Sequence, residues 1–366
     1  MPPEIVHSAC PHDCPSTCAL EVERLAPDRI GRVRGAAQNP YTAGVVCAKV
    51  ARYAERQHHP DRVAQPMRRI GAKGVGREAF EAISWENALD LVAERFIRAE
   101  QRHGAEAVWP YYYAGTMGLV QRDGIHRLRH EKKYSIQKDT ICVGLSDNGW
   151  MAGVGVLRGI DSLEIVDSDL IVVWGGNPVA TQVNVMTHVT RARKRGAKFI
   201  VVDPYRTGTA EAADLHLMLR PGTDGALVAA MIHVLFAEGF ADRAYMEKYA
   251  DAPAELEAHV RDRTPEWAEA ITGIPAGVIR DFARLYGGTK RSFIRVGFGF
   301  SRSRNGAANL HAVSCLPTVT GAWAHRGGGA LYSNRSIYRL DNALITGAEM
   351  RDPSVRALDQ SRIGAV

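Results

Sequence analysis

Apolar and polar residues follow two different periods along this chain, and these periods predict where its strands and helices lie. Largely apolar runs at 170–174 and 198–202 are typical of parallel strands that are covered on both faces. Residues 183–195, between them, have the composition and length of a helix, with Gly196 at its end. The three segments form a β–α–β unit, which predicts an α/β protein with a doubly wound domain.

The same alternation of strands and helices continues towards the carboxyl end. Strands are predicted at 215–219 and 291–296, and helices at 225–236 and 275–286. A further helix begins at Thr264-Pro265, because proline is favoured in the first turn, where its missing N–H has no partner to lose. The loop at 301–306 precedes one more predicted helix, which contains Cys315 as a core residue.

The amino-terminal third has shorter and more polar elements. Leu20 and Val22 alternate with glutamates, which predicts a hairpin whose turn lies around Gly31. Ser84 precedes apolar residues at helical spacing, so a helix is expected from there to Gly104. A short strand is predicted at 107–109. The tyrosines at 111–113 then either pack at its end or line a substrate channel.

Charge and hydropathy exclude two classes of partner. The 366 residues carry a net charge of +6, but no long basic run concentrates it, so nucleic-acid binding is not expected. No apolar run reaches transmembrane length, and no signal peptide is recognisable, so we expect a cytoplasmic protein without a membrane span.

Four of the six cysteines form the strongest chemical signal. Cys10, Cys14, Cys18 and Cys47 are spaced C-x3-C-x3-C-x28-C. Structural zinc usually prefers paired C-x2-C knuckles, and a disulfide framework is not expected in a long chain without a signal peptide. The spacing therefore favours a cubane iron–sulfur cluster. A zinc-stabilised nucleotide-binding module remains the weaker alternative. Lys49 is either a solvated surface residue or a cation between the cluster and a second redox group.

These motifs resemble those of a known family. The run 7–18, followed by Asn39-Pro40, Gly44 and 47–49, is similar to the amino-terminal domain of the molybdopterin oxidoreductases, the dimethyl sulfoxide reductase superfamily, which includes enzymes that act on formate and thiosulfate. The resemblance implies a 4Fe–4S cluster and a molybdenum or tungsten bis(molybdopterin guanine dinucleotide). It also implies that Lys49 lies between the cluster and the pterin and serves electron transfer.

Further candidates for cofactor binding follow the predicted strands. Glycines after a strand admit close backbone approach, and an acid at the end of the second strand can hold ribose hydroxyls. No G-x-G-x-x-G fingerprint is present, which disfavours simple nicotinamide binding. The resemblance implies that such segments grip a guanine dinucleotide arm. Asp224 is expected to act both as a helix N-cap and as a nucleotide contact. The candidates are Gly175, Gly176, Asn177, Asp203, Asp224, Gly297 and Arg302.

Cys142 is the candidate ligand of the catalytic metal. A lone cysteine in an apolar setting is usually a core residue, but its position matches the family's metal ligand, and a soft thiolate suits a metal bound to dithiolenes. Ser146 is the reserve candidate. Val143 stands where related formate-oxidising enzymes have a catalytic histidine, which weakens formate as the substrate. His188 is interpreted as a helix-surface residue.

The resemblance also implies a domain organisation. We expect an iron–sulfur domain at 1–60, a discontinuous α/β domain at 61–141 and 331–366, and a doubly wound domain at 142–330. The family's carboxy-terminal β-barrel has no counterpart, so we interpret the chain as the amino-terminal portion of such an enzyme.

Two functions are compatible with these observations. One is two-electron redox of a small substrate, by oxygen-atom transfer or dehydrogenation, with electrons relayed through the 4Fe–4S cluster. The alternative is a truncated, non-catalytic iron–sulfur electron-transfer or accessory subunit. The expected partners are a small-molecule substrate and either an electron-transfer subunit or the missing carboxy-terminal half.

Overall fold

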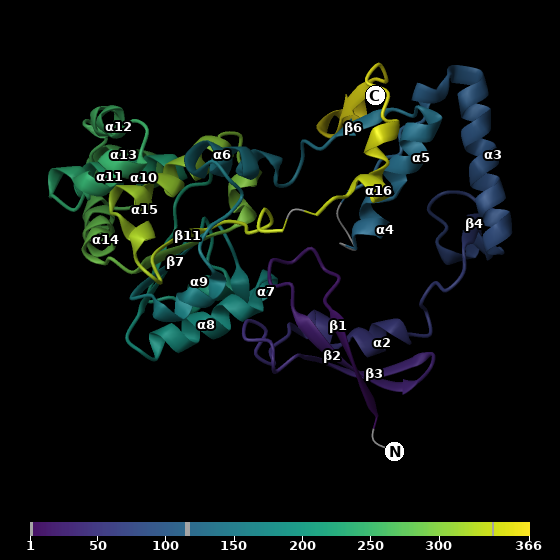
Figure 1. Cartoon of the computed structure of the whole chain (residues 1–366), viewed down its shortest axis with the longest axis horizontal. Helices are drawn as coiled ribbons and strands as arrows, with labels where there is room; N and C mark the ends of the chain where they lie inside the picture. The colour runs from purple at the N-terminus through teal and green to yellow at the C-terminus, as the bar shows by residue number, and fades with distance from the viewer. Residues whose placement is uncertain (1–2, 114–117, 339) are drawn as a thin grey trace.

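The chain folds into three lobes (Figure 1). The computed structural model describes residues 3–113, 118–338 and 340–366. We call residues 3–59 the amino-terminal lobe and residues 144–338 the sheet lobe. The helical lobe comprises 60–113, 118–143 and 340–366. In Figure 1 the sheet lobe lies on the left and the other two lobes lie on the right.

A five-stranded parallel sheet organises the sheet lobe. Its strand order is β11-β10-β7-β8-β9, and the strands are β7 (Leu170–Trp174), β8 (Lys198–Val202), β9 (Leu215–Leu217), β10 (Ser292–Val296) and β11 (Gly329–Leu331). All residues of β7 and β10 are buried, as expected for central parallel strands. The chain builds outward from β7 in both directions, so the topology switches between β7 and β10. This architecture confirms the predicted doubly wound α/β fold.

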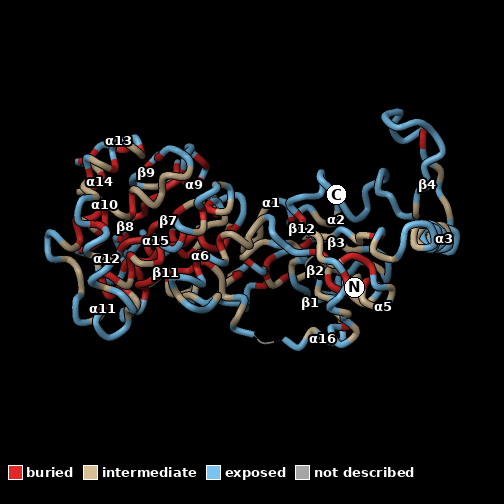
Figure 2. The backbone as a smooth tube through the Cα atoms, turned by 90° about the horizontal axis from the view of Figure 1, so that it is seen from above, coloured by how far each residue is buried: buried red, intermediate tan, exposed pale blue. Residues whose placement is uncertain are grey.

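Helices cover both faces of this sheet, with a separate apolar core on each. The larger core includes α10, α14 and α15, and the smaller core includes α8. Figure 2 shows buried residues concentrated around β7, β8, α10 and α15. The helices of this lobe are α6 (Gly144–Val154), α7 (Pro178–Thr181), α8 (Val183–Arg193), α9 (Gly208–Glu211), α10 (Asp224–Ala237), α11 (Arg243–Tyr249), α12 (Pro253–Val260), α13 (Pro265–Thr272), α14 (Ala276–Gly288) and α15 (Gly306–Val319).

The predicted helices and strands of the sheet lobe are confirmed to within two residues. Thr264 caps α13 as expected, because its side chain accepts a hydrogen bond from Trp267 N. Cys315 packs against the larger core, as predicted. His188 is different: it lies on α8 but is fully buried, so its interpretation as a surface residue was wrong.

The amino-terminal lobe is a three-stranded antiparallel sheet with two short helices. Its elements are β1 (Glu4–Ala9), β2 (Ala19–Ala26), β3 (Arg29–Gly35), α1 (Ala48–Ala51) and α2 (Tyr53–Gln57). The hairpin turn lies at residues 27–28, between β2 and β3, and not around Gly31 as predicted. Gly31 lies within β3, where a Cβ atom would meet side chains of Glu23 and Leu25 at 3.0–3.2 Å. The glycine therefore makes room across the hairpin and does not form its turn.

The helical lobe joins two distant parts of the chain. Strand β6 (Ile136–Lys138) pairs in parallel with β12 (Ala357–Asp359), and its other elements are β4 (Met67–Arg69), β5 (Phe80–Ala82), α3 (Trp85–His103), α4 (Leu119–Asp123), α5 (Ile125–Lys132) and α16 (Ala343–Thr346). Ser84 caps α3 as predicted, but no residue of this helix is buried. The strand predicted at 107–109 is wrong. A 3-10 turn (Ala105–Ala107) occupies its start, and Val108 O accepts only one long-range backbone hydrogen bond, from Ser135 N.

None of the helices in residues 3–113, 118–338 and 340–366 combines the length and apolar character that a bilayer crossing requires.

Candidate functional site

Most of the predicted cofactor-binding residues lie at the carboxyl ends of the parallel strands, a region that we call the carboxyl edge. Gly175, Gly176 and Asn177 follow β7, Asp203 follows β8, and Gly297 follows β10. These three strands are parallel neighbours, so their carboxyl ends lie together at the topological switch point. In open α/β sheets, ligands bind at this position.

The glycines at this edge let two loops cross. Gly297 N donates to Trp174 O at 2.8 Å, and Gly299 N donates to Gly175 O at 2.9 Å. A Cβ atom on Gly297 would lie 2.2 Å from Gly175 O, which is far inside van der Waals contact. The backbone at Gly175 also has a φ of +62°, which favours glycine. Close packing of the β7 and β10 loops therefore requires glycine here even without a ligand.

One buried and one partly buried acid flank the same edge, Asp203 and Asp224. Burial raises the pKa of Asp203, which accepts a hydrogen bond from Tyr205 N at 3.2 Å. Burial also raises the pKa of Asp224, whose Oδ1 accepts from Trp174 Nε1 at 2.8 Å. The predicted N-cap role of Asp224 is wrong, because Thr223 is the N-cap and Asp224 is the first residue of α10. Its side chain accepts hydrogen bonds from the side chains of Trp174 and Asn309.

Four cysteine thiols gather at one end of the amino-terminal lobe. The pKa of Cys18 is raised to about 11, mainly by burial and in smaller part by the neighbouring thiols of Cys10, Cys14 and Cys47. Burial is also the main cause of the raised pKa of Cys10. Cys10, Cys18 and Cys47 also pack in one apolar cluster, and Cys10 N donates to Cys18 O at 2.9 Å. The structure thus brings together all four residues of the C-x3-C-x3-C-x28-C motif.

The four cysteines are free thiols and so are available as ligands. Within the described part of the chain, no three His, Cys, Asp or Glu side chains are close enough to hold one metal ion. Four thiolates on one zinc would each lie about 2.3 Å from the ion, whereas a cubane holds its cysteine sulfurs farther apart. A donor set of four cysteines fits a 4Fe–4S cluster.

The cysteine end of this lobe docks on α7 and α8 of the sheet lobe. Cys14 Sγ donates to Thr181 O at 2.6 Å, and Lys49 Nζ donates to Ala180 O at 3.1 Å. Both carbonyls belong to α7, which directly follows Asn177 of the carboxyl edge. The Lys49 side chain is exposed, and it contacts the helix that follows the glycine loop of the predicted pterin site. The cysteines and the carboxyl edge are therefore neighbours.

A buried polar network completes this interface, and the sequence analysis did not find it. Asn184 Nδ2 donates to Thr42 O at 3.2 Å and to Val45 O at 3.1 Å, and its Oδ1 accepts from Cys18 Sγ at 3.1 Å. The His188 ring stacks on Tyr41 with centroids 5.2 Å apart. Asn184 and His188 stand four residues apart and thus on one helix face, which was the available signal. Burial lowers the pKa of His188.

Cys142 lies in a strained turn immediately before α6. Its φ of +64° is uncommon for a residue with a side chain and is a feature that clusters at functional sites. Arg302 Nη1 donates to Cys142 O at 3.3 Å, and its Nη2 lies 3.8 Å from Cys142 Sγ. Cys142 is partly exposed, whereas the reserve candidate Ser146 is fully buried within α6. The structure thus brings Cys142 and Arg302 together.

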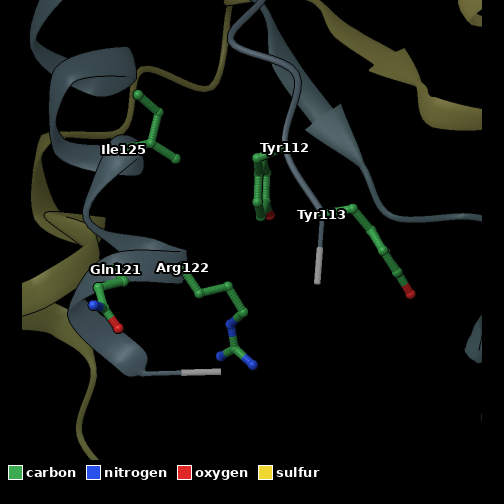
Figure 3. Close-up of a pocket in the computed structure, with 5 residues that line it drawn as sticks. All are labelled: Tyr112, Tyr113, Gln121, Arg122 and Ile125. Carbon is green, nitrogen blue, oxygen red and sulfur yellow. The ribbon is translucent and has the colours of Figure 1, made fainter. Parts of the chain in front are cut away.

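A small pocket lies beside this turn (Figure 3). It has a volume of about 330 Å³ and is lined by Tyr112, Tyr113, Gln121, Arg122 and Ile125. Tyr113 connects the pocket to the cysteine turn, because its hydroxyl donates to Ile141 O at 3.3 Å. Burial raises the pKa of Tyr113 to about 12, with a further contribution from Cys142. The tyrosine therefore stays protonated at neutral pH.

Family models match both parts of this arrangement. The molybdopterin oxidoreductase Fe4S4 domain matches residues 3–59, and the molybdopterin oxidoreductase model matches residues 62–357. The chain belongs to the molybdopterin oxidoreductases. The resemblance seen in the sequence is thereby confirmed, and the cofactors of this molybdopterin oxidoreductase are molybdopterin, with molybdenum or tungsten, and a 4Fe–4S cluster.

Individual proteins agree with this family. The chain is 35% identical to the probable oxidoreductase YoaE of Bacillus subtilis, over 99% of this chain and 53% of the relative. It is 31% identical to the dimethyl sulfoxide reductase DmsA of Escherichia coli, over 89% and 44%. The solved acetylene hydratase of Pelobacter acetylenicus superposes with a TM-score of 0.72 at 26% identity, covering 88% of this chain and 44% of that one. This molybdopterin oxidoreductase chain thus spans about half the length of the relatives it matches.

Proposed function

We propose that this chain carries the iron–sulfur site and part of the molybdopterin site of an enzyme that performs two-electron redox of a small substrate, by oxygen-atom transfer or dehydrogenation. The observation that carries the proposal is the docking of the cysteine end on α7, which joins the four thiols to the carboxyl edge of the sheet. When bound, the metal–pterin centre supplies the two-electron chemistry and the cluster supplies one-electron transfer.

The residues of this chain divide into three roles under this proposal. Cys10, Cys14, Cys18 and Cys47 ligate the cluster, supported by their convergence. Lys49 bridges the two sites, supported by its contact with α7. The carboxyl-edge residues hold the guanine dinucleotide, supported by their alignment at the switch point; they are Gly175, Gly176, Asn177, Asp203, Asp224 and Gly297.

Cys142 is proposed as the metal ligand. Its partial exposure, its strained backbone and the guanidinium of Arg302 beside it support this assignment over the buried Ser146. The pocket at Tyr113 is proposed to accept the substrate, and its volume of about 330 Å³ suits a small molecule. Arg122 donates to Asp123 through Nε and Nη2, and its Nη1 can donate a hydrogen bond to a substrate oxygen.

We further propose that the chain divides at the boundaries expected from the sequence, 1–60, 61–141 with 331–366, and 142–330. The parallel pairing of β6 with β12 supports the discontinuous middle part, because it joins residues 136–138 to residues 357–359.

The test is a metal and cofactor analysis of anaerobically purified protein, counting iron, sulfide, zinc, molybdenum, tungsten and pterin-bound guanosine phosphate. We expect near-stoichiometric iron and sulfide together with molybdenum or tungsten and guanosine phosphate. The Cys18→Ser variant should lose most iron, whereas Cys315→Ser, which removes a cysteine packed against the sheet-lobe core, should retain it.

The other outcomes separate the remaining hypotheses. Iron without molybdenum or tungsten would favour a non-catalytic iron–sulfur subunit. Zinc without iron would refute the cluster assignment. If Cys142→Ser retains iron but changes the metal content or the absorption spectrum of the metal centre, the ligand role is supported; unchanged content and spectrum would contradict it.

A further inference from the structure

Arg295 is a buried cation in the middle of the central sheet. It lies on β10 and is only 4% exposed. Its Nε donates to Gln182 Oε1 at 2.7 Å, and its Nη1 donates to the carbonyls of Leu331 and Tyr332 at 3.0 Å each. All these acceptors are neutral. Among the described residues no carboxylate forms an ion pair with Arg295.

A guanidinium buried without an anion is costly. Desolvation opposes the charged form, and hydrogen bonds to carbonyl and amide oxygens offset only part of that cost. Burial lowers the pKa of Arg295 to about 10, so it remains charged at neutral pH. The sheet lobe therefore contains a positive charge that no acid of that lobe neutralises, and such perturbed charges concentrate at functional sites.

The hydrogen bonds of Arg295 connect it, through Gln182, to the amino-terminal lobe. Gln182, which is also buried, accepts from Arg295 and donates from its Nε2 to Tyr41 OH at 3.0 Å. The residue before it, Thr181, provides the carbonyl that accepts from Cys14 Sγ. Nearby ionisable groups oppose the effect of burial on the pKa of Arg295, with Tyr41 first, followed by Tyr332 and Cys14. The hydrogen bonds of Arg295 thus reach a residue whose neighbour in the chain contacts a thiol of the proposed cluster.

We propose that Arg295 is a redox-tuning residue that raises the reduction potential of the 4Fe–4S cluster across the lobe interface. This inference rests on the proposed binding of the cluster by the four cysteines. Four thiolates make such a cluster net negative, and reduction adds one electron without requiring a proton. A fixed cation nearby stabilises the reduced form more than the oxidised form, because the attraction grows with the negative charge.

Burial makes Arg295 more effective than an exposed cation at a similar distance. Water screens the ammonium of Lys49, which is exposed, whereas the interaction of Arg295 passes through protein with a lower effective dielectric. The charge is also fixed in place, because four neutral oxygens accept hydrogen bonds from the guanidinium: Gln182 Oε1 and the carbonyls of Val296, Leu331 and Tyr332.

Two substitutions abolish the net positive charge at this place, one by deleting the cation and one by adding an anion beside it. Arg295→Met deletes the cation but leaves Gln182 Oε1 and three carbonyls without their donor, so it carries a risk of misfolding. Gln182→Glu keeps Arg295 and places a carboxylate against it, with almost unchanged shape. Arg295→Lys retains the charge. Arg291→Met is the matched control, because Arg291 lies before β10, at the opposite end of the strand, and pairs with Asp169 on the surface.

The experiment is a dithionite titration of each iron-loaded protein, followed by electron paramagnetic resonance of the reduced cluster. We expect Gln182→Glu and Arg295→Met to shift the one-electron equilibrium about tenfold towards the oxidised cluster, which is about 59 mV more negative. Arg295→Lys and Arg291→Met should shift it less than about twofold by the same reasoning.

Iron content distinguishes the possible failures. If the parent protein contains no iron and sulfide, the proposed function fails, and the inference fails with it. If Gln182→Glu contains the full complement of iron and sulfide but its potential equals that of the parent, the inference alone is overturned. A shift of equal size in Arg291→Met would also overturn it, since the effect would then follow net charge and not position.

Discussion

Substitution of Gly297 by alanine tests whether the crossing of the β7 and β10 loops is required by packing. Gly297 has a φ of −91°, which alanine adopts without strain. The new Cβ would lie 2.2 Å from Gly175 O and 2.5 Å from Gly176 Cα. Ordinary Cβ contacts begin near 3.4 Å, so the two loops must separate by about 1 Å. The obstructing atoms are backbone, and no side-chain rotation can relieve them.

The expected cost follows from these contacts. Overpacking of this kind costs about 1–3 kcal/mol, and its upper end applies because both partners are main chain. Separation of the loops also strains the hydrogen bonds from Gly297 N to Trp174 O and from Gly299 N to Gly175 O, each worth about 1 kcal/mol. We therefore expect Gly297→Ala to lower the free energy of unfolding of the sheet lobe by about 3–5 kcal/mol.

Urea unfolding followed by circular dichroism measures this cost. Gly277→Ala is the matched control, because Gly277 lies in α14 and a Cβ atom there has nothing within 4 Å. Alanine in an open helical position should stabilise by about 0.5–1 kcal/mol. The reasoning is refuted if Gly297→Ala has the same urea midpoint as the parent while Gly277→Ala shifts it upward.

Three further predictions concern individual buried groups. Burial raises the pKa of Cys315 to about 11, so about one Cys315 thiol in a thousand is ionised at pH 8. Iodoacetamide should therefore modify Cys315 about a hundredfold more slowly in the folded protein than in urea. Equal rates would contradict the burial of this thiol. Asn184→Ala should destabilise the docking of the amino-terminal lobe by about 1–3 kcal/mol, because the carbonyls of Thr42 and Val45 lose their donor. Urea unfolding measures this loss, and Asn87→Ala, at an exposed position, should have no effect. Asp224 has a raised pKa when folded, so its contribution is present below the ordinary aspartate pKa and is lost as pH rises through the folded pKa. Asp224→Asn should therefore raise the urea midpoint at pH 7 but not near pH 3, and a constant difference would refute this.

Local patterns predicted the sheet lobe well because its signals are local. The apolar runs of β7 and β8 and the Thr264-Pro265 start of α13 depend on neighbouring residues only. The C-x3-C-x3-C-x28-C spacing likewise predicted the gathering of the four thiols, because three of them are within nine residues.

The missed features all depend on tertiary partners. His188 has an ordinary helical context, and only the docking of Tyr41 from another lobe buries it. In the sequence Asp224 precedes the predicted helix, as an N-cap would. In the structure it is the first residue of α10, and its carboxylate accepts a hydrogen bond from the indole of Trp174, fifty residues earlier. Arg295 occupies an alternating position in a buried strand, where no local rule predicts a charge. Contacts between distant segments override local preference at each of these residues.

The absence of buried residues in α3 affects how the energy of this molecule is distributed. The helix has nineteen residues, and its apolar side chains Trp85, Leu89 and Val92 are 49–68% exposed. Its amide hydrogens should therefore exchange with solvent through local opening of small free energy, while those of β7 and β10 exchange only when the whole sheet unfolds. A single melting temperature would therefore report the unfolding of the sheet lobe and would contain almost no information about the stability of α3.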